Sequence, residues 1–193
     1  MKSYDISLCG VNRTLPLIPI AGDLAFASFV IISDTELVSA AAPALVEKIL
    51  QNGPVEAVVT AEAKGIALAY EVSRLLGLKR FIVARKSVKS YMRNVVHHEV
   101  QSITTAEKQA LYLDGTDASA VRGKRVCLID DVISTGESIA AVEELVHHAG
   151  GQVIVRAAVL AEGDAARRSD IVFLQKLPLF RKTGNNEYEP QDL

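Results

Sequence analysis

The sequence has no tryptophan, only two cysteines, and no uninterrupted apolar run of membrane-spanning length. Cys9 and Cys127 cannot build a disulfide framework, and Cys127 lies in an apolar stretch where a free thiol behaves as a small hydrophobic residue. We therefore expect a reducing, cytoplasmic setting. The apolar run from Leu15 to Ile32 is broken by prolines and an aspartate, and the N-terminus lacks the apolar region of a signal peptide. We expect no association with a membrane.

A strong charge of either sign is also missing. The net charge of −2 gives no reason to expect nucleic-acid binding, and it favours a small or only locally charged substrate. With 49% apolar and 23% charged residues, the composition is that of a soluble globular protein. The chain of 193 residues is long enough for one buried core, and we expect a single domain over 1–193.

Short apolar segments alternate with stretches of helical periodicity in most of the chain. We expect strands at 55–60, 81–84, 126–131 and 153–160, with helices at 65–76 and 137–148. This order predicts an α/β fold in which a parallel sheet is flanked by helices. Before it, the pattern predicts a β-hairpin, a strand or buried helix from Leu24 to Ile32, and a helix from Asp34 to Leu50. A basic loop at 85–92 precedes an antiparallel pair of strands at 95–103 and 110–113.

The most specific chemical signal is the stretch VCLIDDVISTGES at residues 126–138. An apolar strand leads into Asp130 and Asp131, which suit a ligand with neighbouring hydroxyls and a Mg²⁺ shared through water and substrate oxygens. The residues that follow place N–H groups and hydroxyls at a helix N-terminus, where a phosphate binds favourably. Taken separately, the acids could merely end a strand, and Ser134 or Thr135 could merely cap the helix. The combination predicts a diol site beside a phosphate site.

This stretch resembles the 5-phosphoribosyl-1-pyrophosphate (PRPP) binding motif of the type I phosphoribosyltransferases, and the similar order and spacing of loops extends over roughly 55–175. The resemblance implies the fold of that family, a parallel sheet flanked by helices with a small N-terminal hood. We expect the hood in 1–33, the core in 34–175 and a C-terminal tail in 176–193. The resemblance also implies Mg²⁺-dependent transfer of the phosphoribosyl group of PRPP to a purine base, and a homodimer.

The resemblance assigns roles to individual residues. It implies that Asp130 and Asp131 hold the ribose hydroxyls, with Mg²⁺ bound indirectly beside them, and that Lys89 helps to neutralise the leaving pyrophosphate. The implied substrate-binding residues are Ala63, Lys64 and Gly65 in a pyrophosphate loop, Arg85, Lys86, Lys89 and Tyr91 in a mobile basic loop, and Ser134, Thr135, Gly136, Glu137 and Ser138 around the 5′-phosphate. For Lys64 and for the basic loop, the alternative is ordinary solvated charge.

The choice of base depends on fewer residues. Within the family that the chain resembles, enzymes acting on hypoxanthine and guanine usually have an Asp where this chain has Ser134, and a lysine near the end of the next strand, which here reads Val159 to Gly163. Glu162 matches a Glu that adenine phosphoribosyltransferases have at that strand end. The resemblance therefore favours adenine, with xanthine or guanine as the alternative.

Nucleotide formation also requires that the base lose a proton. Glu99, just after the basic loop, is a candidate for this step, and the alternative is a solvated strand carboxylate. The candidate catalytic residues are thus Asp130, Asp131, Lys89 and Glu99. A different class of function is a regulator of the same fold that binds PRPP or nucleotide as a signal, although the sequence has no basic stripe to favour it.

Overall fold

The computed structural model describes residues 2–20, 22–100, 109–184 and 187–191. Its centre is a sheet of five parallel strands: Ala57–Ala61 (β4), Ile82–Ala84 (β5), Arg125–Ile133 (β8), Gln152–Glu162 (β9) and Val172–Leu177 (β10). Their order across the sheet is β10-β9-β8-β4-β5, so the strand that carries the two acids lies in the middle. Each of the strands expected after residue 54 is present, which confirms the predicted α/β architecture.

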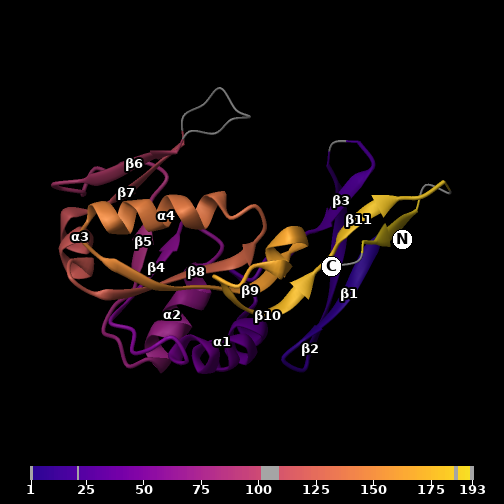
Figure 1. Ribbon diagram of the computed structural model, residues 1–193, viewed down its shortest axis with the longest axis horizontal. Coiled ribbons are helices and arrows are strands. Elements are labelled where there is room, and N and C mark those ends of the chain that lie inside the picture. Colours follow the sequence, from indigo (N-terminus) through magenta and orange to yellow (C-terminus); the bar gives the residue numbers. More distant parts are fainter. Residues whose placement is uncertain (1, 21, 101–108, 185–186, 192–193) are drawn as a thin grey trace.

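Helices cover both faces of this sheet (Figure 1). Thr35–Leu50 (α1) and Ile66–Leu75 (α2) pack on one face, and Gly115–Val121 (α3) and Glu137–His148 (α4) pack on the other. Along β8, Cys127 and Ile129 point into the first layer, while Val126 and Leu128 point into the second. The run before the acids is continuously apolar because both faces of its strand are buried. No helix in the described part of the chain is long and apolar enough to cross a membrane.

A second, antiparallel sheet lies beside the core, and we call it the hood. It contains Ser3–Leu8 (β1), Val11–Pro19 (β2), Leu24–Ala27 (β3), Leu179–Lys182 (β11) and Tyr188–Pro190 (β12), in the order β1-β2-β3-β11-β12. The expected hairpin is present, and its turn residues Cys9 and Gly10 both have positive φ, as a two-residue hairpin turn requires. The segment from residue 176, expected as a tail, instead supplies two hood strands. Strand β11 pairs with β3, with Leu179 opposite Phe26, and β12 pairs with β11.

Several smaller elements complete the chain. Val96–Val100 (β6) and Gln109–Leu113 (β7) form the expected antiparallel pair, and the part of the 95–103 prediction beyond residue 100 lies outside the described residues. Helix α3 was not predicted; it is short, and the Asp114 side chain caps it by accepting from the Thr116 N–H. A 3₁₀ turn, Gly163–Arg167 (η1), follows β9 directly.

The hood is fixed to the core by apolar packing and by ion pairs from Arg13 to Asp34 and Glu36. Leu8 and Phe180 of the hood belong to the same buried cluster as Leu37 of α1. The Phe180 ring is fully buried and meets the Tyr4 ring edge-on, with centroids 5.1 Å apart. Arg13 of β2 donates to both carboxylate oxygens of Asp34, the N-cap of α1, at 2.6 and 2.8 Å. Beyond these contacts, β10 leads directly into β11, so the hood begins at the carboxyl edge of the parallel sheet (Figure 1).

Replacing Phe180 tests this attachment. Phe180→Ala removes a fully buried ring shared by the two sheets and should lower the free energy of unfolding by about 3–5 kcal/mol, measured by urea titration. Phe180→Leu keeps much of the volume and should cost distinctly less. Equal losses in the two variants would contradict close packing of the ring.

Candidate active site

The predicted site residues lie on turns that leave neighbouring parallel strands in the same direction. Residues 62–65 follow β4, residues 85–93 follow β5, residues 134–136 follow β8, and Glu162 ends β9. Because carboxyl ends of parallel strands meet at one edge, these segments share one side of the sheet, where ligands of such folds bind. Contacts between the side chains of these segments fix their positions relative to one another.

Asp130 and Asp131 lie within the last residues of β8, which runs two residues beyond the expected end at 131. Asp131 is 4% exposed, and the Asp131 N–H donates to Asp130 Oδ1 at 2.9 Å. Burial, followed by the charge of Asp131, raises the pKa of Asp130 to about 7. Burial also raises the pKa of Asp131, and the charge of Lys64 opposes that shift. The folded chain therefore holds two carboxyl groups that compete for one proton.

Lys64 is the cation closest to this pair in the described residues. Its Nζ lies 3.9 Å from Asp131 Oδ2, and its charge also acts on Asp130 and on Glu162. Asp131 Oδ2 is buried and has no hydrogen-bond partner in the described part of the chain. An unpartnered, buried carboxylate oxygen fits a hydroxyl donor or a hydrated cation, which are the groups that a ribose and its Mg²⁺ would bring.

The loop after β8 is open to an anion. Ser134, Thr135, Glu137 and Ser138 are exposed, and Gly136 is the N-cap of α4 with a left-handed φ of 86°. The N-cap Gly136 has no side chain to cap α4. Among the described residues, the first turn has one long side-chain contact, 3.4 Å, from the Glu137 N–H to Thr135 Oγ1. Gly136, and neither Ser134 nor Thr135, therefore occupies the N-cap position, and Thr135 makes only this long contact with the first turn. The positive end of the α4 dipole faces this loop, which suits a phosphate.

Arg168 is a neighbour of this loop that the sequence did not reveal. A Cβ on Gly136 would lie 2.2 Å from Arg168 Nη1, so the guanidinium rests directly against the glycine. Asp170 holds the guanidinium in place, with bonds of 2.9 Å from Nε and 2.7 Å from Nη2. The phosphate loop therefore has a fixed positive charge at its side, and no sequence motif places Arg168 there.

The loop after β4 comes very close to β8. A Cβ on Gly65 would meet Thr60 Oγ1 at 2.4 Å and the Ile129 carbonyl oxygen at 3.3 Å. Thr60 and Gly65 are both buried, so neither can move aside easily. Ala63 and Lys64 are exposed at the tip of the loop, and the Glu62–Ala63 peptide bond is cis. Only a glycine at residue 65 lets this loop bring Lys64 beside Asp131.

The basic loop after β5 is tied down at its start. Arg85 pairs with Tyr112 of β7 through two backbone hydrogen bonds of 2.9 Å. Its Nη2 donates to Tyr91 Oη at 3.2 Å, and Lys89 Nζ donates to Ser87 Oγ at 2.7 Å. Lys86 is exposed, and its N–H donates to Glu62 Oε2 at 3.1 Å. The structure thus joins the basic loop to the loop that carries Lys64.

Two further predicted residues occupy different surroundings. Glu162 is half-buried at the end of β9, and burial raises its pKa against the opposing charge of Lys64. It therefore shares the electrostatic environment of the aspartate pair. Glu99 is exposed on β6, opposite Ala110, in a ladder that is separate from the parallel sheet. Its role in proton transfer stays a prediction.

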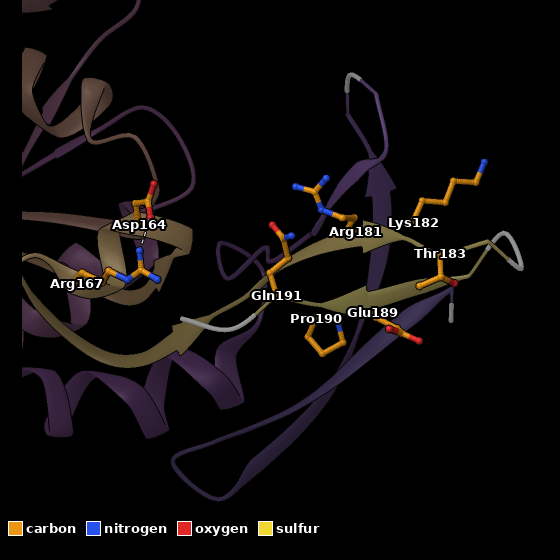
Figure 2. A pocket seen from close by; sticks show the side chains of 8 residues that line it. All are labelled: Asp164, Arg167, Arg181, Lys182, Thr183, Glu189, Pro190 and Gln191. Carbon is orange, nitrogen blue, oxygen red and sulfur yellow. Dashed lines mark hydrogen bonds and ion pairs between the residues drawn. The ribbon is translucent and has the colours of Figure 1, made fainter.

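A cleft of about 520 Å³ opens between η1 and the hood. Figure 2 shows Asp164 and Arg167 on the core side, with Arg181 and Gln191 extending from β11 and from just after β12 into the space between. The remaining lining residues are Lys182, Thr183, Glu189 and Pro190. The lining is polar and carries three cations, none of which the sequence singled out.

A family model described as the phosphoribosyl transferase domain matches residues 31–186, most of the chain. The chain belongs to the phosphoribosyltransferase family. Membership confirms the resemblance drawn from the acidic motif, and it extends the matched region to α1 at one end and into the hood strands at the other. No cluster of three or more His, Cys, Asp or Glu side chains with metal-binding geometry occurs among the described residues.

Curated relatives of this chain are named for hypoxanthine and guanine. It is 32% identical over 117 residues to a hypoxanthine/guanine phosphoribosyltransferase of Methanothrix soehngenii and 31% identical over 110 residues to one of Methanococcus voltae. These alignments cover 61% and 57% of this chain, and 58% and 54% of the relatives. The chain thus spans little more than half the length of these relatives.

A solved structure with a similar fold is named for a different base. The adenine phosphoribosyltransferase of Thermoanaerobacter pseudethanolicus has a TM-score of 0.67, with 21% identity, over 84% of this chain and 95% of that one. At this identity the likeness shows the fold. The preference for adenine is therefore not confirmed by the comparisons.

The close approach at Gly65 generates one prediction. Gly65→Ala should lower the free energy of unfolding of this phosphoribosyltransferase by about 1–3 kcal/mol, because the new methyl group collides with Thr60. Adding Thr60→Ala removes the colliding atom, so the double variant should lose less than the two single variants together. Additive losses in urea titrations of the three variants would contradict the described contact.

The aspartate pair generates a second prediction. The pKa of Asp130 moves from the ordinary 3.8 to about 7 on folding, so the folded state binds more protons between these values. This residue's contribution to the free energy of unfolding therefore falls as pH rises through that window. Asp130→Asn keeps the acceptor for the Asp131 N–H and lacks the charge.

The variant should gain stability over wild type as the pH rises from 4 to 8, and each kcal/mol raises Tm by roughly 2–4 °C. Asp164→Asn, at a side chain that is 98% exposed, is the control and should stay parallel to wild type. A stability difference between Asp130→Asn and wild type that does not change with pH would rule out a raised pKa at Asp130.

Proposed function

We propose that this chain transfers the 5-phosphoribosyl group of PRPP to a purine base, with adenine favoured, and releases pyrophosphate. The observation that carries the proposal is the buried pair Asp130 and Asp131, with an oxygen that has no hydrogen-bond partner among the described residues, beside the N-terminus of α4, whose N-cap is a glycine. One side of this arrangement suits the ribose diol and the other suits the 5′-phosphate. Membership of the phosphoribosyltransferase family supports the same assignment.

Within this proposal, the residues divide the work of the reaction. The two aspartates accept hydrogen bonds from the ribose hydroxyls, and the loop 134–138 binds the 5′-phosphate, which together fix the anomeric carbon. Bond cleavage there passes through an oxocarbenium-like state as the base nitrogen attacks. Lys64, Arg85 and Lys89 stabilise the charge that develops on pyrophosphate. Mg²⁺, held near the aspartates through water and substrate oxygens, would add positive charge to the same leaving group.

The base would enter the cleft between η1 and the hood. Glu162 supports adenine, because a carboxylate on the residue that precedes η1 can accept from an exocyclic amino group of the base. Ser134 supports it as well, since the enzymes for hypoxanthine and guanine in this family usually carry an Asp there. The second candidate is a hypoxanthine/guanine enzyme, which the named sequence relatives favour. The cations Arg167 and Arg181 could donate to a 6-oxo group in that case.

Two further expectations accompany the proposal. A cytoplasmic location follows from the sparse use of cysteine, and Cys127 is a buried free thiol. A homodimer follows from the resemblance to the family. If the protein binds PRPP without transferring its ribose, the regulator alternative replaces the enzymatic one.

The direct test is incubation with PRPP, Mg²⁺ and each of adenine, hypoxanthine, guanine and xanthine, with nucleotide followed by chromatography. We expect AMP from adenine at the highest rate. Asp131→Asn should lower kcat/KM by at least about a hundredfold, because it removes a charged contact to the reacting sugar. Glu71→Gln on α2, which disturbs only a surface pair with Arg74, should retain wild-type rates. Absence of product with every base would refute the enzymatic proposal.

A further inference from the structure

Glu62 lies between the two loops that would bind pyrophosphate. It follows β4 directly, and its own N–H donates to the carbonyl of Ala84, the last residue of β5, at 2.9 Å. Its carboxylate then turns to the basic loop, where Oε2 accepts from the Lys86 N–H at 3.1 Å and Oε1 lies 3.5 Å from Arg85 Nη1. One side chain thus contacts the backbone and a cation of a loop more than twenty residues away.

The surroundings of Glu62 are strongly cationic. The hydrogen bond from the Lys86 N–H lowers the pKa of Glu62 most, burial works against it, and the charges of Lys89, Arg85 and Lys86 lower it further. Glu62 is therefore ionised at neutral pH. All three cations belong to the basic loop that the resemblance assigns to pyrophosphate. Arg85 also acts on the half-buried Asp117, so it has acidic neighbours on more than one side.

The two contacts of Glu62 differ in kind. The hydrogen bond from Lys86 involves backbone, so it fixes the path of the basic loop whether or not a ligand is present. The ion pair with Arg85 is long, and the two side chains are 33% and 26% exposed, so water screens it and a more highly charged anion can replace it.

We propose that Glu62 is a positioning residue that anchors the basic loop by accepting a hydrogen bond from the Lys86 N–H. Its carboxylate pairs with the Arg85 guanidinium until a diphosphate displaces it. The inference rests on the proposed function, since it concerns the diphosphate part of that site. Glu62 sets the affinity for pyrophosphate in two opposing ways. The anchor favours binding because the loop is already ordered, and the carboxylate opposes binding because it competes for Arg85.

Two substitutions separate these effects. Glu62→Gln keeps an oxygen that can accept from the Lys86 N–H but has no charge, whereas Glu62→Ala removes both the acceptor and the charge. The probe is inorganic pyrophosphate with Mg²⁺, measured by calorimetry on the full chain. Glu71→Gln is the matched control, because Glu71 also pairs with an arginine, at 2.8 Å, but lies on α2 away from both loops.

We expect Glu62→Gln to bind pyrophosphate about twofold to fivefold more tightly than wild type. This factor corresponds to the free energy of one exposed ion pair. The gain should shrink at high salt, and KM for PRPP should fall while kcat stays unchanged. Glu62→Ala should bind pyrophosphate more weakly than wild type, because the basic loop must then be ordered on binding. Glu71→Gln should match wild type.

Three outcomes overturn the inference. If Glu62→Gln binds no more tightly than wild type, the carboxylate does not compete for Arg85. If Glu62→Ala binds as tightly as Glu62→Gln, the hydrogen bond to Lys86 is not an anchor. In both cases the proposed function stands as long as wild type binds pyrophosphate and forms nucleotide. If wild type binds neither PRPP nor pyrophosphate, the proposed function and this inference fail together.

Discussion

The burial of two adjacent carboxyl groups in the middle strand is the constraint on which the rest of the site depends. Asp130 and Asp131 leave water side by side, and burial raises the pKa of each. A strand can hold such charges only if the surrounding core supplies the stability, and the apolar layers on both faces of β8 do so. Lys64 is the cation that offsets the charge of the pair, and its position depends on the closeness of Gly65 to Thr60. The fold therefore leaves the charges of this site only partly balanced, as a site awaiting a polar ligand requires.

Contacts outside the acidic motif determine how its loops are held. Arg168 rests against Gly136 and is itself held by Asp170, so the phosphate loop is supported from a segment that follows β9. Glu62 gives comparable support to the basic loop from the end of β4. In both cases the supporting residue lies one strand away from the loop that it holds. A parallel sheet makes this arrangement natural, because all of its carboxyl-end turns are neighbours whatever their order in the sequence.

The sequence predicts the features that depend on neighbouring residues better than those that depend on contacts between residues far apart in the chain. Four of the five parallel strands were predictable because their apolar runs reflect burial, whereas β10 at the edge of the sheet was not predicted. Helix α1 was predictable from Asp34, whose side chain does cap it. Helix α3 was missed because seven residues carry too little periodicity. The pairing of β11 with β3, the contact of Arg168 with Gly136 and the bridge from Glu62 to Lys86 join distant residues, and no local pattern encodes them. The reading of Ser134 as a sign of adenine specificity stays a prediction, since the named sequence relatives act on other purines by name.

The hood also bears on the order in which the chain can fold. Strand β3 is made early in synthesis, but its partner β11 follows the whole parallel sheet in sequence. A ribosome-bound chain can therefore assemble the core while one edge of β3 has no partner and the apolar residues of β1 and β2 lack the cover of Phe180. Such an edge can pair with other chains, so the interval before β11 emerges is when the exposed edge of β3 most favours aggregation. The cleft beside η1, which β11 and β12 help to line, forms last.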